Sequence, residues 1–307
     1  MKKTAKRVLK RLSKTPLAAV LSLTWKALAV LHLACLELWW KLSRAPMPSK
    51  EEQALVAENA TFVFKSFQRH SMAKRLYRNI RRYYPQVRVV IADDSREPLR
   101  ICDSNLMIVT LPFNSGLSRG LNAALEQVQT PYVIRMDDDE LLTPYSNFHG
   151  HLQYLMNNPQ VDLVGISPRN LPLRGGWKKK ITAYNRFSMS DAPMPLKIPH
   201  MTRLDTDHIV LGKVANIFIA RTEPYRAVGY DNNIRMIDHH EFFFRAAGHL
   251  VSVLECNSYV LHSHNVFDQK YQAYRNDTKA DLLYIRKKHG QARQKGQPKK
   301  LPHNTLI

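Results

Sequence analysis

Short apolar runs alternate with segments of helical spacing along most of the chain from Thr61 onward. Apolar runs bounded by turn residues predict buried strands, and longer segments with apolar positions three and four apart predict helices. The predicted strands are 61–64, 87–92, 106–110, 132–136, 161–166, 214–220, 251–254 and 259–261, and the predicted helices are 71–83, 117–128, 147–157, 238–247 and 268–288. This alternation is typical of an α/β sheet with crossover helices.

The segment 168–208 interrupts the alternation. It is rich in Pro and Lys, contains Gly175-Gly176, and shows no sustained period. A long segment of this kind inside a compact domain is typical of a functional loop. We therefore expect residues 168–208 to lie over a binding site.

The first fifty residues combine a basic start with an apolar run. Seven Lys and Arg residues lie in 1–14, and the apolar run 17–40 is interrupted by Lys26, His32 and Glu37. On a helix with about 100° per residue, most of the polar positions gather on one side and the leucines and tryptophans occupy the rest. The pattern predicts an amphipathic helix on the surface of an anionic membrane.

Three other interpretations fit the same residues. The helix can pack on the protein's own core, be part of a cleaved signal peptide, or be a type II membrane anchor. Pro46, Pro48 and the polar residues 49–53 are typical of a linker. The predicted organisation is a basic tail and helix at 1–50, one folded domain at 51–281, and a second basic tail at 282–307.

The net charge of +21 belongs mainly to the two ends of the chain. Residues 1–50 contribute +10 and residues 282–307 contribute +7, which leaves +4 for residues 51–281. That distribution fits an anionic membrane at least as well as a polynucleotide, so no nucleic-acid partner is expected. The three cysteines are far apart and lack zinc-ligand spacing, which favours a reducing compartment.

Carboxylates follow two of the predicted strands at the point where each strand ends. Asp137-Asp138-Asp139-Glu140 follows strand 132–136, and Asp93-Asp94 follows strand 87–92. The carboxyl ends of parallel strands meet at one edge of a sheet, where α/β proteins bind ligands. Adjacent carboxylates repel one another unless a cation is bound, and aspartate oxygens suit Mg²⁺ or Mn²⁺. An acidic loop or a helix N-terminus is the alternative.

A glycine-containing turn lies between the two acidic strand ends. It runs from Gly116 to Gly120 and enters a predicted helix. The amides of such a turn, together with Arg119, would meet an anionic ligand. A plain turn with a helix cap would show the same residues.

Several of these segments together resemble the family 2 glycosyltransferases with the GT-A fold, and more narrowly the ganglioside-type β-1,4-N-acetylgalactosaminyltransferases. The resemblance covers roughly residues 60–265, in the same order and at matching separations. The segments that carry it are 81–85 (RRYYP), 89–95 (VVIADDS), 116–122 (GLSRGLN), 132–139 (YVIRMDDD), 162–165 (DLVG), 214–222 (VANIFIART), 228–231 (VGYD) and 240–243 (HEFF).

The resemblance implies a role for each candidate residue. Asp139 and His262 would bind the divalent metal, Mn²⁺ or Mg²⁺, and Asp137 would contact the ribose or the metal-bound diphosphate. The remaining donor-binding candidates are Asp93, Asp94, Lys65, Arg69 and Arg119. His264 is a second, weaker match for the histidine ligand.

Glu241 is the residue that the resemblance makes the general base for the acceptor hydroxyl. Asp238 is its substitute if the register differs by one helical turn. The other interpretation pairs Glu241 with Arg245 on the same helix, without a catalytic role.

The implied activity is inverting, metal-dependent transfer of GalNAc or another N-acetylhexosamine from a UDP-sugar to a glycan or glycolipid acceptor. The expected setting is polysaccharide or lipopolysaccharide synthesis at the cytoplasmic face of a bacterial inner membrane, with a Golgi type II enzyme as the alternative. Two other functions remain open: a polybasic membrane or nucleic-acid adaptor on a degenerate transferase fold, and nucleotidyl or phosphoryl transfer at the same carboxylates.

Overall fold

The computed structural model describes residues 18–172, 194–263, 271, 273–274 and 278–293. Its strands are β1 (Ala60–Ser66), β2 (Arg88–Asp93), β3 (Leu106–Thr110), β4 (Tyr132–Arg135), β5 (Glu140–Leu141), β6 (Leu163–Asn170), β7 (His208–Val210), β8 (Phe218–Arg221) and β9 (Ser252–His262). Its helices are α2 (Ala18–Leu42), α3 (Lys50–Asn59), α4 (His70–Tyr83), α5 (Leu117–Glu126), α6 (Phe148–Asn157), α8 (Thr222–Val228), α9 (Asp238–Ala246) and α11 (Lys279–Arg293).

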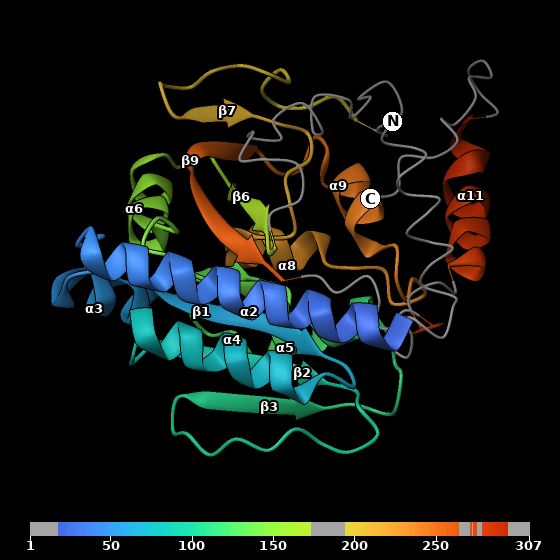
Figure 1. The fold of residues 1–307 in the computed structure, drawn as a ribbon. Coiled ribbons are helices and arrows are strands. Elements are labelled where there is room, and N and C mark those ends of the chain that lie inside the picture. The colour runs from blue at the N-terminus through green and yellow to red at the C-terminus, as the bar shows by residue number, and fades with distance from the viewer. Residues whose placement is uncertain (1–17, 173–193, 264–270, 272, 275–277, 294–307) are drawn as a thin grey trace, which may run out of the picture.

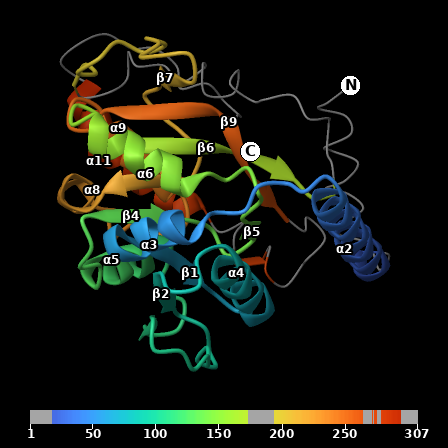
Figure 2. The same cartoon turned by 90° about the vertical axis from the view of Figure 1, so that its left-hand side faces the viewer.

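The described strands form one mixed sheet with helices on both faces (Figures 1 and 2). The strand order is β3-β2-β1-β4-β8-β6-β9-β5, and β7 pairs with β9. Strands β1 to β4 are mutually parallel, whereas β8 runs antiparallel between β4 and β6. The predicted α/β class is confirmed.

Alternation along the central strands divides the core into two layers. Successive side chains of a strand point to opposite faces of its sheet. On β1, Phe62 and Phe64 accordingly pack with α3, α4 and α6, while Val63 packs with α5, α8 and α9. The sheet is thereby buried on both faces, which explains the nearly continuous apolar runs in the sequence.

The parallel pairing brings three strand ends to one edge of the sheet. Ser66 at the end of β1 is paired with Asp93 at the end of β2, and Val63 of β1 is paired with Arg135 at the end of β4. The residues that follow β1, β2 and β4 therefore lie next to one another. The predicted meeting of the acidic strand ends is confirmed.

Several predicted strands have different limits in the structure. Strand β8 begins at Phe218, so the predicted residues 214–217 precede it, and the Asn216 carbonyl oxygen there accepts a hydrogen bond from the Arg135 guanidinium. The predicted strands 251–254 and 259–261 form the single strand β9, which pairs with β7 through its first half, with β5 through its second half and with β6 through both. Strand β6 extends through Asn170, into the segment predicted to be irregular. Residues 173–193 of that segment lie outside the described residues.

The predicted linker 49–53 is instead the start of a helix. The Ser49 hydroxyl accepts a hydrogen bond from the Glu52 amide at 3.2 Å, and the Glu52 carboxylate accepts one from the Ser49 amide at 2.7 Å. This reciprocal capping box begins α3 directly after Pro48. The polar residues satisfy the free amides of the first turn, which is why they resemble a linker in the sequence.

The N-terminal helix is confirmed as α2, which lies beside the domain next to α4 (Figures 1 and 2). Its stretch Val20–Leu42 is long and apolar enough to cross a membrane, by length and composition. Two residues of the predicted polar side, Glu37 and Lys41, line a cavity between α2 and α4. The basic residues 1–14 lie outside the described residues, as does most of the predicted helix 268–288 before α11.

Candidate active site

The ends of β1 and β2 form a corner around Asp94. This side chain is fully buried, forms an ion pair with Lys65, and accepts a hydrogen bond from the Gly116 amide at 3.0 Å. Gly116 has a φ of 103°, a backbone conformation that glycine adopts freely. The structure thus brings together Lys65, Asp94 and the glycine-containing turn, as the sequence predicts for a donor-binding corner.

A second glycine makes room for Lys65. A Cβ atom at Gly120 would lie 2.6 Å from Lys65 Cδ, so a side chain there would displace the lysine. Burial lowers the pKa of Lys65, and the Asp94 carboxylate opposes that shift. Arg119, between these glycines, is exposed and donates to the Asn232 carbonyl at 3.1 Å. The structure does not bring Arg119 to Asp94, and its role in donor binding stays a prediction.

Asp93 is committed to the backbone of the loop that follows β2. Its buried carboxylate accepts hydrogen bonds from the Ser95 hydroxyl at 2.6 Å and from the Leu99 amide at 2.7 Å. These bonds hold the loop that carries Asp94. Asp93 therefore shapes the corner, and Asp94 is the better placed of the two to contact a nucleotide.

Two of the three aspartates after β4 lie against Arg69. The Arg69 guanidinium forms ion pairs with Asp138 and, at 3.2 Å, with Asp139. Burial raises the pKa of Asp138 to about 7, against the pull of Arg69. A buried carboxylate pair of this kind is costly unless cations surround it, which explains why an arginine faces it.

His262 reaches the same carboxylates from β9. Its Nε2 atom lies 3.5 Å from Asp139 Oδ1, and its Nδ1 atom lies 3.1 Å from Asn170 Oδ1. The pairing of Glu140 with His262 in the β5–β9 ladder explains this approach. The predicted meeting of Asp139 and His262 is thus seen in the structure, while His264 lies outside the described residues.

Few side chains near Asp139 are able to bind a metal ion. Within the described ranges, no group of three or more His, Cys, Asp or Glu side chains is arranged to hold a metal ion. Asp139 and His262 supply two converging ligands of suitable chemistry. Mg²⁺ in nucleotide enzymes commonly takes one or two protein ligands and completes its coordination with substrate phosphates and water. The residues present therefore fit a divalent ion that arrives with a diphosphate.

A buried arginine that the sequence analysis missed lies beneath the acidic strand end. Arg135 of β4 is fully buried, and its Nη2 atom lies 2.8 Å from Asp137 Oδ1. The signal was available, because a charge inside an otherwise apolar strand is unusual and requires a partner. The ion pair anchors Asp137 at the strand end.

Asp238 is the first residue of α9 and lies close enough to Arg135 and Asp137 to interact with their charges. It is buried, and its Oδ2 atom has no hydrogen-bond partner among the described residues. Burial raises the pKa of Asp238 to about 6; Arg135 opposes this shift and the negative charge of Asp137 adds to it. Asp238 is therefore a carboxylate close to the acidic strand end, with one oxygen available and a pKa near neutrality.

Glu241, one turn along α9, has two cationic partners and a histidine within hydrogen-bond distance. Arg245 Nε and Lys288 Nζ each lie 2.8 Å from its Oε1 atom, and His289 Nε2 lies 3.2 Å away. Burial opposes ionisation of Glu241, but these hydrogen bonds hold its pKa at about 2. The alternative pairing of Glu241 with Arg245 is present, and α11 adds two further partners that the sequence did not indicate.

Glu241 is expected to make folding stability depend on pH in the acidic range. Its folded pKa of about 2 lies below its ordinary value of 4.5. The stability that it contributes is complete above pH 4.5 and is lost as the pH falls toward 2. Urea unfolding should show that the protein has a higher free energy of unfolding than Glu241→Gln, and that this difference becomes smaller as the pH falls through this range. A difference that does not change with pH would contradict the ion-pair account.

A second buried cation lies beside α9. Lys213 Nζ is 2.8 Å from His240 Nε2, and burial lowers the pKa of Lys213 to about 7 although Asp238 raises it. Its position between the apolar residues Leu211 and Val214 was the signal in the sequence, since a lysine inside an apolar run is seldom fully solvated. Lys213 is therefore a buried lysine near Asp238 that is only partly charged at neutral pH.

The family model of glycosyl transferase family 2 matches residues 61–225, so the chain belongs to this family. The resemblance predicted from the sequence is thereby confirmed, and the α/β sheet is that of a GT-A glycosyltransferase. The matched residues include the strand ends that carry Lys65, Asp94 and Asp139.

Two curated relatives are β-1,4 N-acetylgalactosaminyltransferases. The type 2 protein of Mus musculus is 30% identical over 252 residues, which are 78% of this chain and 47% of that protein. The type 1 protein of Rattus norvegicus is 33% identical over 199 residues, which are 62% of this chain and 36% of that protein. The chain thus spans less than half the length of either relative.

Among solved structures, the crystal structure of residues 1–349 of S. aureus TarS is similar with a TM-score of 0.49 and 13% sequence identity. The similarity covers 67% of this chain and 60% of that chain.

Proposed function

We propose that the protein is a metal-dependent, inverting glycosyltransferase. It moves GalNAc or another N-acetylhexosamine from a UDP-sugar to a glycan or glycolipid acceptor of the cell surface. Family membership supports the reaction class, and the names of the two relatives support the choice of sugar. The single observation that carries the proposal is the meeting of the ends of β1, β2 and β4 at one edge of the sheet, with Asp94 paired to Lys65 and Asp139 paired to Arg69. Asp238 interacts there with the charges of Arg135 and Asp137.

The corner at β1 and β2 is proposed to bind the nucleotide. Asp94 accepts hydrogen bonds there and is the candidate for the uridine, while Asp93 holds the loop in place. Lys65 and Arg69 supply positive charge on the side toward the diphosphate. Arginine and lysine differ in this role, because the guanidinium plane can hold two phosphate oxygens at once.

Asp139 and His262 are proposed to hold the divalent ion, Mn²⁺ or Mg²⁺, with Asp137 facing the same ligand. A bound ion would act as a Lewis acid and neutralise the charge that the departing diphosphate gains. Arg69 already contacts Asp138 and Asp139, so a diphosphate brought to these carboxylates would also meet its guanidinium.

Asp238 is proposed as the general base, in preference to Glu241. The acceptor hydroxyl gives its proton to the free Oδ2 atom of Asp238 as its oxygen bonds to the anomeric carbon and UDP departs with the electrons of the broken bond. Direct attack from the face opposite UDP inverts the anomeric configuration. A pKa of about 6 leaves Asp238 ionised at neutral pH yet basic enough to accept a proton, whereas Glu241 at about 2 is a much weaker base.

UDP release by the purified protein tests the proposed function. A panel of UDP-sugars would be tried with Mn²⁺ and with EDTA, in the presence and absence of glycan acceptors. We expect metal-dependent turnover of one donor and a product of inverted configuration. Absence of both turnover and donor binding would favour the adaptor function, and release of pyrophosphate would favour nucleotidyl transfer.

The proposed location is the cytoplasmic face of a bacterial inner membrane, in polysaccharide or lipopolysaccharide synthesis. It is supported by the exposed apolar helix α2 and by the basic charge of the chain ends. A Golgi type II enzyme with α2 as its anchor is the alternative, since α2 is long and apolar enough to cross a membrane. The small net charge of residues 51–281 gives no support to a nucleic-acid partner.

A further inference from the structure

One side of α2 is packed on the folded domain. Ala29 and Trp40 are buried against Leu141, Tyr259 and Leu261, and further residues of the helix pack around this cluster. Ala29 and Trp40 are eleven positions apart, which corresponds to about 16 Å of helix. The second half of α2 is therefore fixed along the domain surface.

The opposite side of α2 is apolar and exposed. We call it the α2 outer face, and its members are Val20, Leu23, Leu28, Val30, Leu31, Leu38, Trp39 and Leu42. Leu23 is 70% exposed, Leu31 62% and Leu38 58%. An apolar surface of this length on a soluble domain usually marks an interaction site.

Helix α2 is long enough to span a bilayer, but its packing does not permit this while it is docked. A spanning helix needs about 30 Å of its length surrounded by lipid. Here the half that contains Ala29 and Trp40 has a folded domain on one side. The geometry fits a helix that lies along a membrane surface with its outer face in the lipid.

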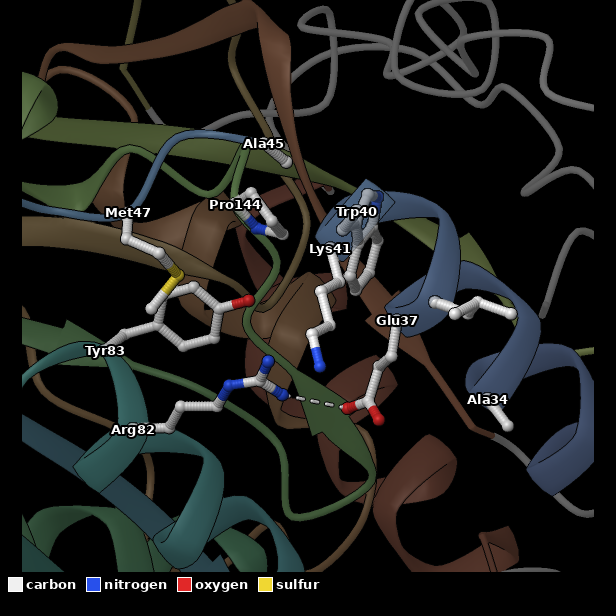
Figure 3. A pocket seen from close by; sticks show the side chains of 10 residues that line it. Ala34, Glu37, Trp40, Lys41, Ala45, Met47, Arg82, Tyr83 and Pro144 are labelled. Atoms are coloured by element: carbon white, nitrogen blue, oxygen red, sulfur yellow. Dashed lines mark hydrogen bonds and ion pairs between the residues drawn. The ribbon is translucent and has the colours of Figure 1, made fainter. Parts of the chain in front are cut away.

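Cations border the outer face on the side toward α4. Lys41 and Arg82 line a cavity of about 480 Å³ between α2 and α4, and Arg82 is held at 3.1 Å by Glu37 (Figure 3). Lys74 and Arg78 precede Arg82 at four-residue intervals, so the three share one side of α4. We call Lys74, Arg78 and Arg82 the α4 basic stripe.

The other border of the outer face is aromatic and basic. The Arg169 guanidinium lies 3.4 Å from the centroid of the Tyr259 ring, and Trp39 and Tyr145 line the same cavity of about 350 Å³. Tryptophan, tyrosine and arginine are the side chains that favour the headgroup layer of a bilayer. The apolar surface thus lies between two borders suited to headgroups.

We propose that the α2 outer face and the α4 basic stripe together bind the surface of an anionic phospholipid bilayer, with α2 lying along the surface. The apolar side chains enter the acyl boundary, and the stripe, Lys41 and Arg169 meet the lipid phosphates. Charge complementarity identifies the occupant, because an apolar protein partner would offer no counter-charge to Lys74 and Arg78 on the exposed side of α4, whereas anionic lipid does. The proposal concerns location and does not depend on the proposed reaction.

Binding of the full chain to vesicles tests the proposal. The two vesicle types are pure phosphatidylcholine and phosphatidylcholine with about one third phosphatidylglycerol. The stripe variant is Lys74→Gln, Arg78→Gln and Arg82→Gln. Its matched control, Arg88→Gln, Arg100→Gln and Arg286→Gln, removes the same charge at exposed positions on other elements. Circular dichroism melting checks that both variants fold.

We expect the protein to bind the anionic vesicles more tightly, and the stripe variant to lose at least about tenfold in partition coefficient. The control should stay within about threefold. An apolar-face variant, Leu31→Gln and Leu38→Gln, should also lose binding, and about 0.5 M salt should release the protein.

Several results would overturn the proposal. Equal losses in the stripe variant and the control would mean that total charge alone attracts the protein. Unchanged binding of the apolar-face variant would show that the α2 outer face takes no part in membrane binding. Binding that neither salt nor the stripe variant weakens would indicate a helix inserted across the bilayer. Absence of any vesicle binding would leave the face without a membrane role.

Discussion

Replacement of Asp238 by asparagine is expected to slow sugar transfer about 10²–10⁴-fold, the usual contribution of a general base. Asparagine keeps the size of the side chain but cannot take the acceptor proton. Donor affinity should stay within about twofold, because the proposed nucleotide contacts lie on Lys65 and Asp94. Single-turnover transfer and donor titration by calorimetry separate the two effects.

The pH profile gives a second readout of the same carboxylate. Since Asp238 must be ionised to act, kcat/KM should rise with pH through about 6, the pKa that burial gives this group. The matched variant is Glu241→Gln, which changes a carboxylate on the same helix and should retain transfer with the same acidic limb. Loss of transfer in Glu241→Gln, with activity retained in Asp238→Asn, would assign the base to Glu241.

Replacement of Asp139 by asparagine is expected to remove the metal dependence of donor binding and to lower transfer at least about a hundredfold. An amide is a poorer ligand for a hard divalent ion than a carboxylate, and the site has few other protein donors. The measurement is donor affinity with Mn²⁺ and with EDTA, for the protein and for the variant. The expected result is a large difference for the protein and none for Asp139→Asn.

Asp138→Asn is the matched control for this experiment. Asp138 is the neighbouring aspartate, it pairs with Arg69, and its pKa of about 7 already favours a partly protonated side chain. Metal-dependent donor binding should therefore persist in Asp138→Asn. If Asp138→Asn instead abolished that dependence and Asp139→Asn preserved it, Asp138 rather than Asp139 would be the metal ligand.

The parts of the site that depend on local pattern were predictable from the sequence. Asp94 and Asp139 follow apolar strands directly, and the rule that parallel strand ends meet at one edge places them together. Choosing between Asp238 and Glu241 required contacts that no local pattern contains. Glu241 meets Lys288 and His289 of α11, nearly fifty residues away, and these contacts lower its pKa.

The secondary structure likewise includes elements that the local sequence pattern predicts and elements that it does not. Strand β3 has the predicted limits, because its apolar run coincides with its ladder. Strand β9 was predicted as two strands because the polar residues Glu255 and Asn257 interrupt the apolar pattern. In the structure β6 pairs with both halves of β9, with a register shift between Gly165 and Ser167, and Glu255 is paired with His208 of β7. Residues 49–53 were predicted as a linker, since a capping box and a polar linker use the same side chains.

The capping box at Ser49 has a mechanical consequence. The Ala45 amide still donates to the Trp40 carbonyl at 2.8 Å, and α3 begins at Lys50, so very little chain separates α2 from the domain. A connection this short and hydrogen-bonded allows α2 very little movement relative to the folded domain. With α2 on a bilayer, the site at the strand ends would be held at a fixed distance from the membrane surface. The protein would then favour acceptors whose reactive hydroxyl lies at that distance from the lipid.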